Sequence, residues 1–420
     1  MLSTSVILVG GTVLVAVVAA LLARALPQKT VSPTREGPLQ GFRGFLALGI
    51  FLHHTFIWFH YTHGRGWTDS EGFRQFGEGR VVLFFMLAAM LFYGRLIDAR
   101  GRDFDWLKLF VSRALRLAPA YWFAMGLMFL VLGVATACHV DGAGTGIVLR
   151  SWGDIAAASM AWLGFSMLGM PAIDAYLNTP MITAGVTWTM PFEVSFYLLL
   201  PLLALPLRMR MPRTALAVGL AAAVWLAAWA PDPMYFVPFA GGMLAALAIR
   251  TPRLVRPLGH PAFGVAAIAA LASVIWVFPT AYSPAALLMQ ALALTIVAAG
   301  NDLFGILRWR APQMLGNCAY SLYLLHGIAL YTLFLLAIGA ERAAALSTLQ
   351  YVLVIALFAP VVIALAWASQ RWIESPPRRW TASVVAWLRR LVTRPARVVE
   401  AQPTPSAAAA CAPISARRAA

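Results

Sequence analysis

The run RGFLALGIFLHH, from Arg43 to His54, places side chains that bind anions and move protons inside an apolar, membrane-length stretch. Arginine binds phosphate and carboxylate groups, and histidine acts as a base or nucleophile near neutral pH. Because eleven residues separate them, Arg43 and His54 share one helix face, about 16 Å apart along the axis. His53 is rotated by roughly 80° the other way. The run therefore predicts that His54, near mid-membrane, faces whatever Arg43 faces.

An ionisable group at that depth is costly, and it marks a functional site by default. The alternative is a histidine that forms a hydrogen bond with a carbonyl of a neighbouring helix. The run by itself leaves both interpretations of His54 open.

A basic pair precedes a later apolar run, in the stretch VSRALRLAPAYW. Arg113 and Arg116 are three residues apart, so they lie on one helix face. Two guanidinium groups there can hold a phosphorylated ligand through paired hydrogen bonds. The alternative is ordinary anchoring of a membrane helix by its basic cytoplasmic flank.

Two further apolar runs carry polar groups. TWTMPFEVSFYLLLPLL contains Glu193 with Trp188 close by, and a carboxylate in a span needs a cationic or histidine partner, or a polar cavity in which it stays protonated. LGNCAYSLYLLHGIALY contains Tyr323 and His326, for which hydrogen bonding between helices is the alternative reading. These residues are added to the candidates for one polar site.

Composition identifies the environment in which such a site must form. Of 420 residues, 61% are hydrophobic and 11% are charged, which is typical of a polytopic membrane protein. The net charge of +16 arises from arginines between apolar runs, as the positive-inside rule expects, so nucleic-acid binding is not expected. The three cysteines are scattered, so neither a disulfide framework nor a metal site is expected.

The expected fold is all-α, a polytopic transmembrane helix bundle of about eleven spans. The stretch 151–169 is expected to lie along the outer surface or re-enter, because basic loops on both sides require an even number of crossings. The N-terminus is expected outside and the C-terminus in the cytoplasm. The candidate spans are 4–23, 42–60, 81–97, 117–137, 187–207, 214–230, 234–249, 261–279, 283–300, 317–339 and 347–370.

Three parts of the chain are distinguished. Residues 1–37 are an extra N-terminal span with a basic linker, 38–373 are the membrane core, and 374–420 are a cytoplasmic tail. Within that tail, TASVVAWLRRLVTR is expected to rest on anionic membrane lipids, and the last twenty residues, rich in Ala, Pro and Ser, are expected to be disordered.

Five stretches, in this order, resemble the acyltransferase-3 family of bacterial integral-membrane acyltransferases, over about residues 38–373. Members O-acylate surface polysaccharides, lipid-linked glycans and other extracytoplasmic acceptors. The chain departs from the family in its extra N-terminal span, and in Ala88 and Ala89, which stand where the family often has Ser-Gly. The matching elements are Arg43, Gly44 and His54; VVLFFMLAAML; Arg113, Arg116, Pro119 and Tyr121; Trp188, Glu193, Phe196, Tyr197 and Pro201; and AYSLYLLH.

The resemblance implies acetyl-CoA or another acyl-CoA as the donor substrate, with no permanently bound cofactor, and a glycan or lipid-linked acceptor outside the bacterial inner membrane. Arg43, Arg113 and Arg116 would hold the polyanionic head of CoA. His54 would act as general base, or would first accept the acyl group itself. Glu193 and His326 are candidates for orienting His54 or the acceptor.

Two other classes of protein also explain parts of the pattern. A secondary transporter, or a flippase of a glycan intermediate, needs polar groups at mid-membrane, although no internal repeat is evident. A lipid-phosphate-dependent glycosyltransferase would hold a metal with acidic residues of an outer loop, and loop 61–80 contains Glu71 and Glu78 as well as Asp69. Interspersed arginines, Arg80 among them, favour a solvated loop of mixed charge instead.

Overall fold

The computed structural model describes residues 2–25, 36–67, 71–138, 140, 151–173, 178–229 and 231–392, and within these the side chains of 2–13, 36, 71–73 and 392 are not described. The expectation of disorder in the last twenty residues lies outside these ranges. All the elements in the described ranges are helices, so the expected all-α class is confirmed.

Six helical segments are long and apolar enough to cross a membrane, and a bent pair of helices makes a seventh. Four shorter apolar helices accompany them, at Leu14–Ala25, Arg213–Trp229, Pro261–Trp276 and Pro284–Ala298. A polytopic bundle therefore fits, whereas the count of eleven spans is not confirmed. The six long segments are Gly37–Thr62, Arg74–Asp98, Trp106–Ala137, Val186–Leu207, Ala319–Ile338 and Thr348–Leu391.

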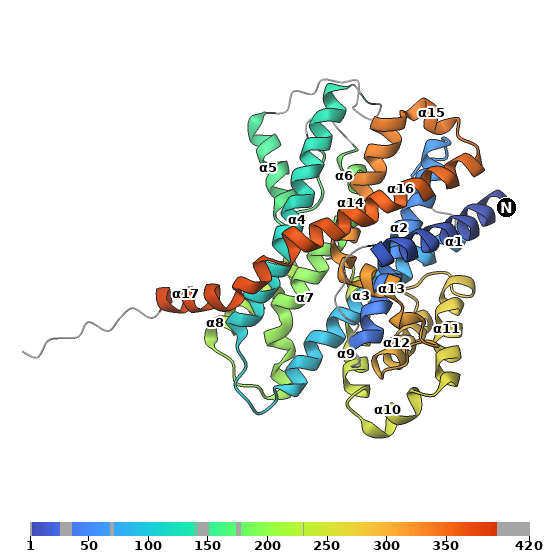
Figure 1. Cartoon of the computed structure of the whole chain (residues 1–420). Coiled ribbons are helices and arrows are strands. Elements are labelled where there is room, and N and C mark those ends of the chain that lie inside the picture. The colour runs from blue at the N-terminus through green and yellow to red at the C-terminus, as the bar shows by residue number, and fades with distance from the viewer. Residues whose placement is uncertain are drawn as a thin grey trace, which may run out of the picture.

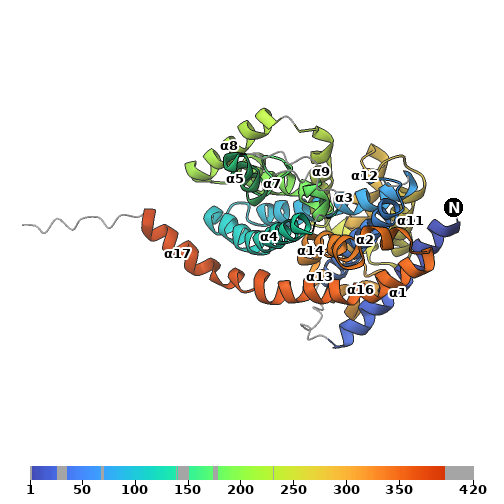
Figure 2. The same cartoon turned by 90° about the horizontal axis from the view of Figure 1, so that it is seen from above.

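Five helices stand side by side and form the part of the bundle that matters for the site (Figure 1). Seen from above, α16 (Thr348–Ser369) and α17 (Thr381–Val392) run obliquely along one side of these upright helices, and α1 (Leu2–Ala25) packs against α16 (Figure 2). The five are α2 (Glu36–Thr62), α3 (Glu71–Asp98), α4 (Trp106–Ala137), α7 (Met190–Leu203) and α14 (Ala319–Tyr331).

Local sequence signals fix where several of these helices begin. Asp105 caps α4 by accepting a hydrogen bond from the Lys108 amide, and Ser347 and Gln350 form a capping box at the start of α16. Gly44 lets α2 approach α13 (Arg310–Asn317), because a Cβ at this position would lie 2.1 Å from the Pro312 carbonyl oxygen. This glycine follows Arg43, so the close contact fixes the backbone that carries the arginine.

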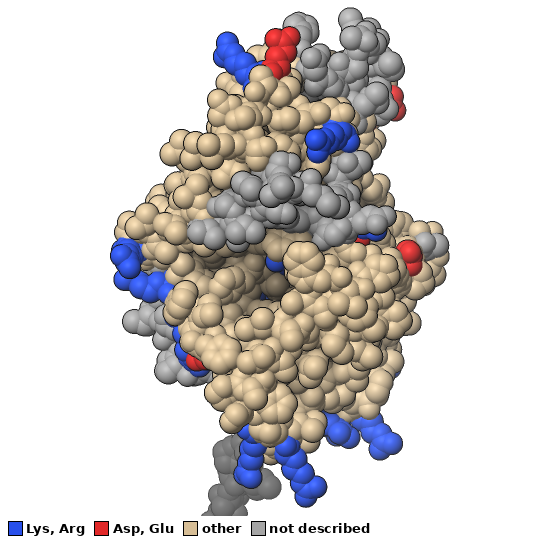
Figure 3. Space-filling model, turned by 90° about the vertical axis from the view of Figure 1, so that its right-hand side faces the viewer, with Lys and Arg blue, Asp and Glu red and all other residues tan. Residues whose placement is uncertain are grey.

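Basic side chains gather at one end of the molecule, which we call the basic end. Lys and Arg side chains project together from the lower end in Figure 3. The short helix α10 (Pro252–Leu258), with its exposed Arg253 and Arg256, lies at the same end in Figure 1. Such one-sided enrichment is what the positive-inside rule describes. That the basic end faces the cytoplasm remains a prediction.

The expected span 234–249 is one arm of a bent pair. Val237–Ala248 forms α9, and the pair Pro233–Ala248 and Pro252–Leu258 is bent by 96°. The bend follows from proline at the first position of α10, which begins a new helix after the C-terminus of α9.

The stretch 151–169 forms only one short helix, α5 (Trp152–Leu163). Its twelve residues rise about 18 Å, which is less than the roughly 30 Å thickness of a hydrocarbon core. It lies beside α4, where the Tyr121 hydroxyl donates to the Trp162 carbonyl at 2.6 Å.

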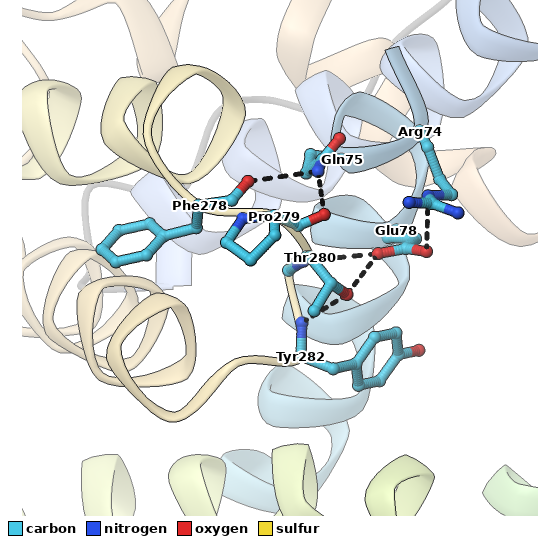
Figure 4. A network of polar contacts seen from close by, with 8 residues as sticks. Arg74, Gln75, Glu78, Phe278, Pro279, Thr280 and Tyr282 are labelled. Carbon is cyan, nitrogen blue, oxygen red and sulfur yellow. Dashed lines mark hydrogen bonds and ion pairs between the residues drawn. The ribbon is translucent and has the colours of Figure 1, made fainter. Parts of the chain in front are cut away.

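The interpretation of residues 61–80 as a solvated loop is wrong. Glu78 and Arg80 lie in α3, which begins at Glu71. Figure 4 shows Glu78 accepting a hydrogen bond from Thr280 at 2.8 Å and facing Arg74 at 3.7 Å, so α3 is bound to the connection between α11 (Pro261–Trp276) and α12 (Pro284–Ala298). Asp69 lies outside the described residues. The apolar pattern alone missed this start because the first turns of α3 alternate charged and aromatic residues.

Candidate active site

A pocket of about 780 Å³, with the open solvent at its mouth included, lies between α2, α3, α4, α7 and α14. Four separate parts of the sequence contribute its polar side chains, so the pocket forms only when the chain folds. Two aromatic-rich faces, from α3 and from α14, supply the rest of the wall. The residues that line the pocket include Arg43, Phe92, Arg113, Arg116, Thr189, Glu193, Tyr197 and Tyr323.

The three arginines expected to hold an anionic ligand all line this pocket. Arg43 comes from α2 and donates to the Gln40 side chain at 3.3 Å, while Arg113 and Arg116 come from the first turns of α4. The Arg113 guanidinium lies 4.5 Å from the centre of the Phe92 ring, in the geometry of a cation–π contact. Three cations on one apolar pocket form a site suited to a polyanion.

Glu193 lines the same pocket, on the α7 side. The Tyr197 hydroxyl, one helical turn further along α7, donates to its carboxylate at 2.5 Å. Across the described ranges, the structure gives Glu193 no hydrogen bond or ion pair with either His54 or His326. The pocket thus separates Glu193 from the histidines, and its catalytic role stays a prediction.

Trp188 does not line the pocket, although the adjacent Thr189 does. Its ring packs edge-on against Phe192 and Tyr235, with centroids 5.8 and 5.1 Å apart. Trp188 therefore supports the wall behind Thr189, and the described residues bring it into no contact with the histidines.

His54 and His326 form a hydrogen-bonded pair between α2 and α14. His326 Nε2 lies 3.0 Å from His54 Nδ1, and His326 is fully buried. The alternative reading, a histidine bonded to a carbonyl of a neighbouring helix, is incomplete for His54, because the ring also pairs with a second imidazole on α14.

Backbone carbonyls determine which nitrogen atoms of this pair carry protons. The Leu322 carbonyl lies 2.9 Å from His326 Nδ1 and can only accept, so Nδ1 is the protonated nitrogen of a neutral His326. His326 Nε2 is then an acceptor, and His54 Nδ1 donates to it while also lying 3.1 Å from the Ile50 carbonyl. The lone pair of His54 is consequently on Nε2. A lone pair held in a fixed direction is the requirement for a general base.

His53 points to a different helix, as the helical geometry predicts. Its ring packs on Gly77 of α3, where a Cβ would lie 2.4 Å from His53 Nε2. His53 is buried, whereas His54 is partly exposed. The two neighbouring histidines therefore serve different interfaces.

A short irregular segment packs against the helix that carries His326. It comprises α6 (Thr179–Ile182) and the 3₁₀ helix η1 (Val186–Thr189), with positive φ at Ala184 and Gly185 between them. Gly327 admits this segment, because a Cβ there would lie 2.3 Å from the Thr183 carbonyl carbon. The segment thus packs directly on the turn of α14 that carries His326.

Tyr323 connects the pocket to the histidine pair. It lines the pocket, and its ring lies 6.3 Å from the His326 ring. Its hydroxyl donates to the Val186 carbonyl at 2.6 Å and lies 2.8 Å from the Thr189 hydroxyl. Neither His54 nor His326 is among the described residues that line the pocket, so Tyr323 is a pocket residue whose ring contacts the pair.

Sequence reasoning missed one charged residue of this region. Glu374, which was taken as the first residue of the cytoplasmic tail, is only 2% exposed and accepts a hydrogen bond from Ser321 at 3.2 Å. The available signal was a single carboxylate directly after an apolar span and before basic residues, in QRWIESPPRR.

The chain matches the family model described as acyltransferase domain over residues 38–370. No curated protein and no solved structure matches it. The family match covers well over half of the 420 residues, and it includes every residue of the pocket and of the histidine pair. The chain therefore belongs to the acyltransferase-3 family and is a membrane acyltransferase.

Proposed function

We propose that this acyltransferase moves an acyl group, with acetyl as the first candidate, from cytoplasmic acyl-CoA to a hydroxyl group of an extracytoplasmic glycan or lipid-linked acceptor in the bacterial inner membrane. The observation that carries the proposal is the His54–His326 pair, held at 3.0 Å and next to Tyr323 of a pocket that contains three arginines.

The arginine pocket supports acyl-CoA as the donor. CoA carries several phosphate charges on one end and a thioester on a long flexible arm. Arg43, Arg113 and Arg116 would bind those phosphates through charge-assisted hydrogen bonds. The apolar wall beyond them, which includes Phe84 and Phe85 of α3, would hold the arm.

In direct transfer, His54 Nε2 removes the proton of the acceptor hydroxyl as its oxygen attacks the thioester carbon. The carbon–sulfur bond then breaks, and the thiolate takes the proton from Nε2 to leave as free CoA. During the step His54 is an imidazolium, and its Nδ1–H donates to His326 throughout. In the second route, His54 first accepts the acyl group and the hydroxyl attacks afterwards.

The thioester must pass Tyr323 to reach His54 Nε2. Tyr323 and Thr189 are joined by a hydrogen bond of 2.8 Å, so a rotation of either side chain is the movement that the reaction requires.

The proposal is tested with inverted membrane vesicles supplied with radiolabelled acetyl-CoA, by counting alkali-labile label in the envelope glycan and lipid fractions. We expect His54→Ala to lower transfer by about 10²- to 10⁴-fold, the usual contribution of a general base. His53→Ala is the matched control and is expected to retain activity, because His53 faces α3. Absence of CoA-dependent label in wild-type vesicles, or loss of activity only in the His53 variant, would refute the proposal.

The bent pair α9–α10 is the feature that a transporter would share, since transporters often contain broken helices. In transporters such breaks lie at mid-membrane and expose backbone groups to the substrate. Here the second arm carries exposed Arg253 and Arg256 at the basic end, so the break lies at the surface of the bundle. The bend therefore gives the transporter reading no support.

A further inference from the structure

Glu374 is a buried carboxylate that the mechanism above does not use. It ends the π-helical segment Gln370–Glu374 that follows α16, and its side chain is 2% exposed. A buried charge is costly unless it is paired, so its surroundings must compensate for it.

The compensation comes from Arg378 and from two arginines that line the donor pocket. Arg378 Nη1 lies 3.7 Å from Glu374 Oε1, and Ser321 donates to Oε2 at 3.2 Å. Glu374 also interacts electrostatically with Arg116 and Arg43, both of which line the pocket. Arg43 and Arg116 in turn repel one another, and Arg378 adds to that repulsion. One carboxylate therefore stands among three cations.

We propose that Glu374 is the internal counter-ion of the donor site and that Arg378 is a further arginine of that site. In the empty protein Glu374 neutralises part of the charge of Arg43, Arg116 and Arg378. When a polyanion binds, its phosphates take over this neutralisation and share the arginines with Glu374. The inference rests on the proposed function in taking the polyanion to be the head of acyl-CoA.

This arrangement predicts opposite effects of Glu374 on the stability of the empty protein and on the affinity for the ligand. The carboxylate and the ligand's phosphates carry the same sign and face the same arginines, so they oppose each other across a short distance. Removing the charge of Glu374 leaves three mutually repelling cations, which lowers the stability of the protein without ligand. The same change leaves those cations available to the ligand, which strengthens binding. A residue that only stabilises the fold would lower the stability of the empty and the bound protein equally.

The test measures binding of free CoA to the purified full chain in detergent, by calorimetry and by the rise of Tm on ligand addition. For Glu374→Gln we expect tighter CoA binding, on the order of tenfold for a unit charge at roughly 10 Å and an effective dielectric constant near 20. We also expect a lower Tm without ligand and a larger rise of Tm with it. Glu374→Asp keeps the charge and is expected to return both quantities toward wild type.

Asp98→Asn is the matched control. Asp98 is also paired with an arginine at the basic end, since Arg250 donates to it at 2.5 and 2.7 Å, but neither residue lines the donor pocket. This variant is expected to lower Tm while leaving the ligand-induced rise unchanged. The counter-ion role is overturned if CoA raises the Tm of the Glu374→Gln variant by the same amount as it raises the Tm of wild type.

Arg378→Gln keeps the proposal testable if the Glu374 variant does not fold, because Arg378 is 42% exposed and a substitution there disturbs little packing. We expect this variant to bind CoA several-fold more weakly, and unchanged binding overturns its place in the site. A wild-type protein that fails to bind CoA refutes the proposed donor. Normal wild-type binding with no effect of either variant refutes only the present inference.

Discussion

The hydrogen bond between His326 and His54 gives the sharpest quantitative prediction. Replacing His326 with Leu removes the acceptor of the His54 Nδ1–H while keeping an apolar side chain of similar size in a fully buried position. Replacing it with Gln keeps an acceptor oxygen within reach of the same proton. The pair of variants therefore separates the hydrogen bond from the packing.

The magnitude follows from the charge that His54 carries during the reaction. A hydrogen bond from a charged donor contributes about 1.5–3 kcal/mol, and each 1.36 kcal/mol changes a rate by about tenfold. Loss of the bond should therefore lower kcat by roughly 10- to 150-fold in the His326→Leu variant. The Ile50 carbonyl, 3.1 Å from the same nitrogen, is a second acceptor, which favours the lower part of that range.

The assay follows labelled acetyl transfer in vesicles at varied acetyl-CoA concentration. KM for acetyl-CoA is expected to stay near wild type in both variants, because His326 does not line the arginine pocket. His326→Gln should keep kcat within about fivefold of wild type, since the amide oxygen accepts a hydrogen bond from the same charged donor. The double variant with His54→Ala should be no slower than His54→Ala alone, because both changes remove the same function. Equal losses in the Leu and Gln variants, or a change confined to KM, would show that the bond has no catalytic role.

Two further variants test the pocket and the packing around the pair. Arg113→Ala should raise KM for acetyl-CoA by about 10- to 100-fold, because a charge-assisted hydrogen bond to the donor is lost. The control Arg95→Ala should leave KM unchanged, because Arg95 contacts Phe92 but does not line the pocket. Equal effects of the two variants would indicate that Arg113 only anchors the helix in the membrane. Gly327→Ala should lower stability by about 1–3 kcal/mol, measured as the shift of thermal unfolding in detergent, because its Cβ would lie 2.3 Å from the Thr183 backbone; a variant as stable as wild type would contradict that close contact.

The different directions of His53 and His54 could be predicted from sequence because both lie within one helix, whereas the expectation that His54 faces what Arg43 faces is not met at the pocket, which Arg43 lines and His54 does not. Helical geometry fixes relative directions over eleven residues without any knowledge of neighbours. The structure agrees that the two histidines face different helices, one toward His326 and the other toward Gly77. The arginines of α2 and α4 also meet at one pocket, as their common position at the helix mouths predicts.

Features that depend on contacts between distant segments could not be predicted in this way. The tilt of α16, which carries Glu374 back into the bundle, is set by packing that apolar runs do not encode (Figure 2). The short segment Thr179–Thr189 has too few residues for a periodic pattern and packs closely on Gly327. The first turns of α3 include Glu78, which accepts a hydrogen bond from Thr280, about two hundred residues later in the chain.

The contact between Tyr323 and Thr189 bears on how the cell keeps its energised membrane intact. An arginine-lined funnel that ran straight through the bundle would conduct protons and small anions down the membrane potential. The Tyr323 and Thr189 hydroxyl groups line this pocket and are bonded to each other and to the Val186 carbonyl, so a chain of water past them would have to break these hydrogen bonds first. We therefore expect the contact to limit leakage of protons between turnovers.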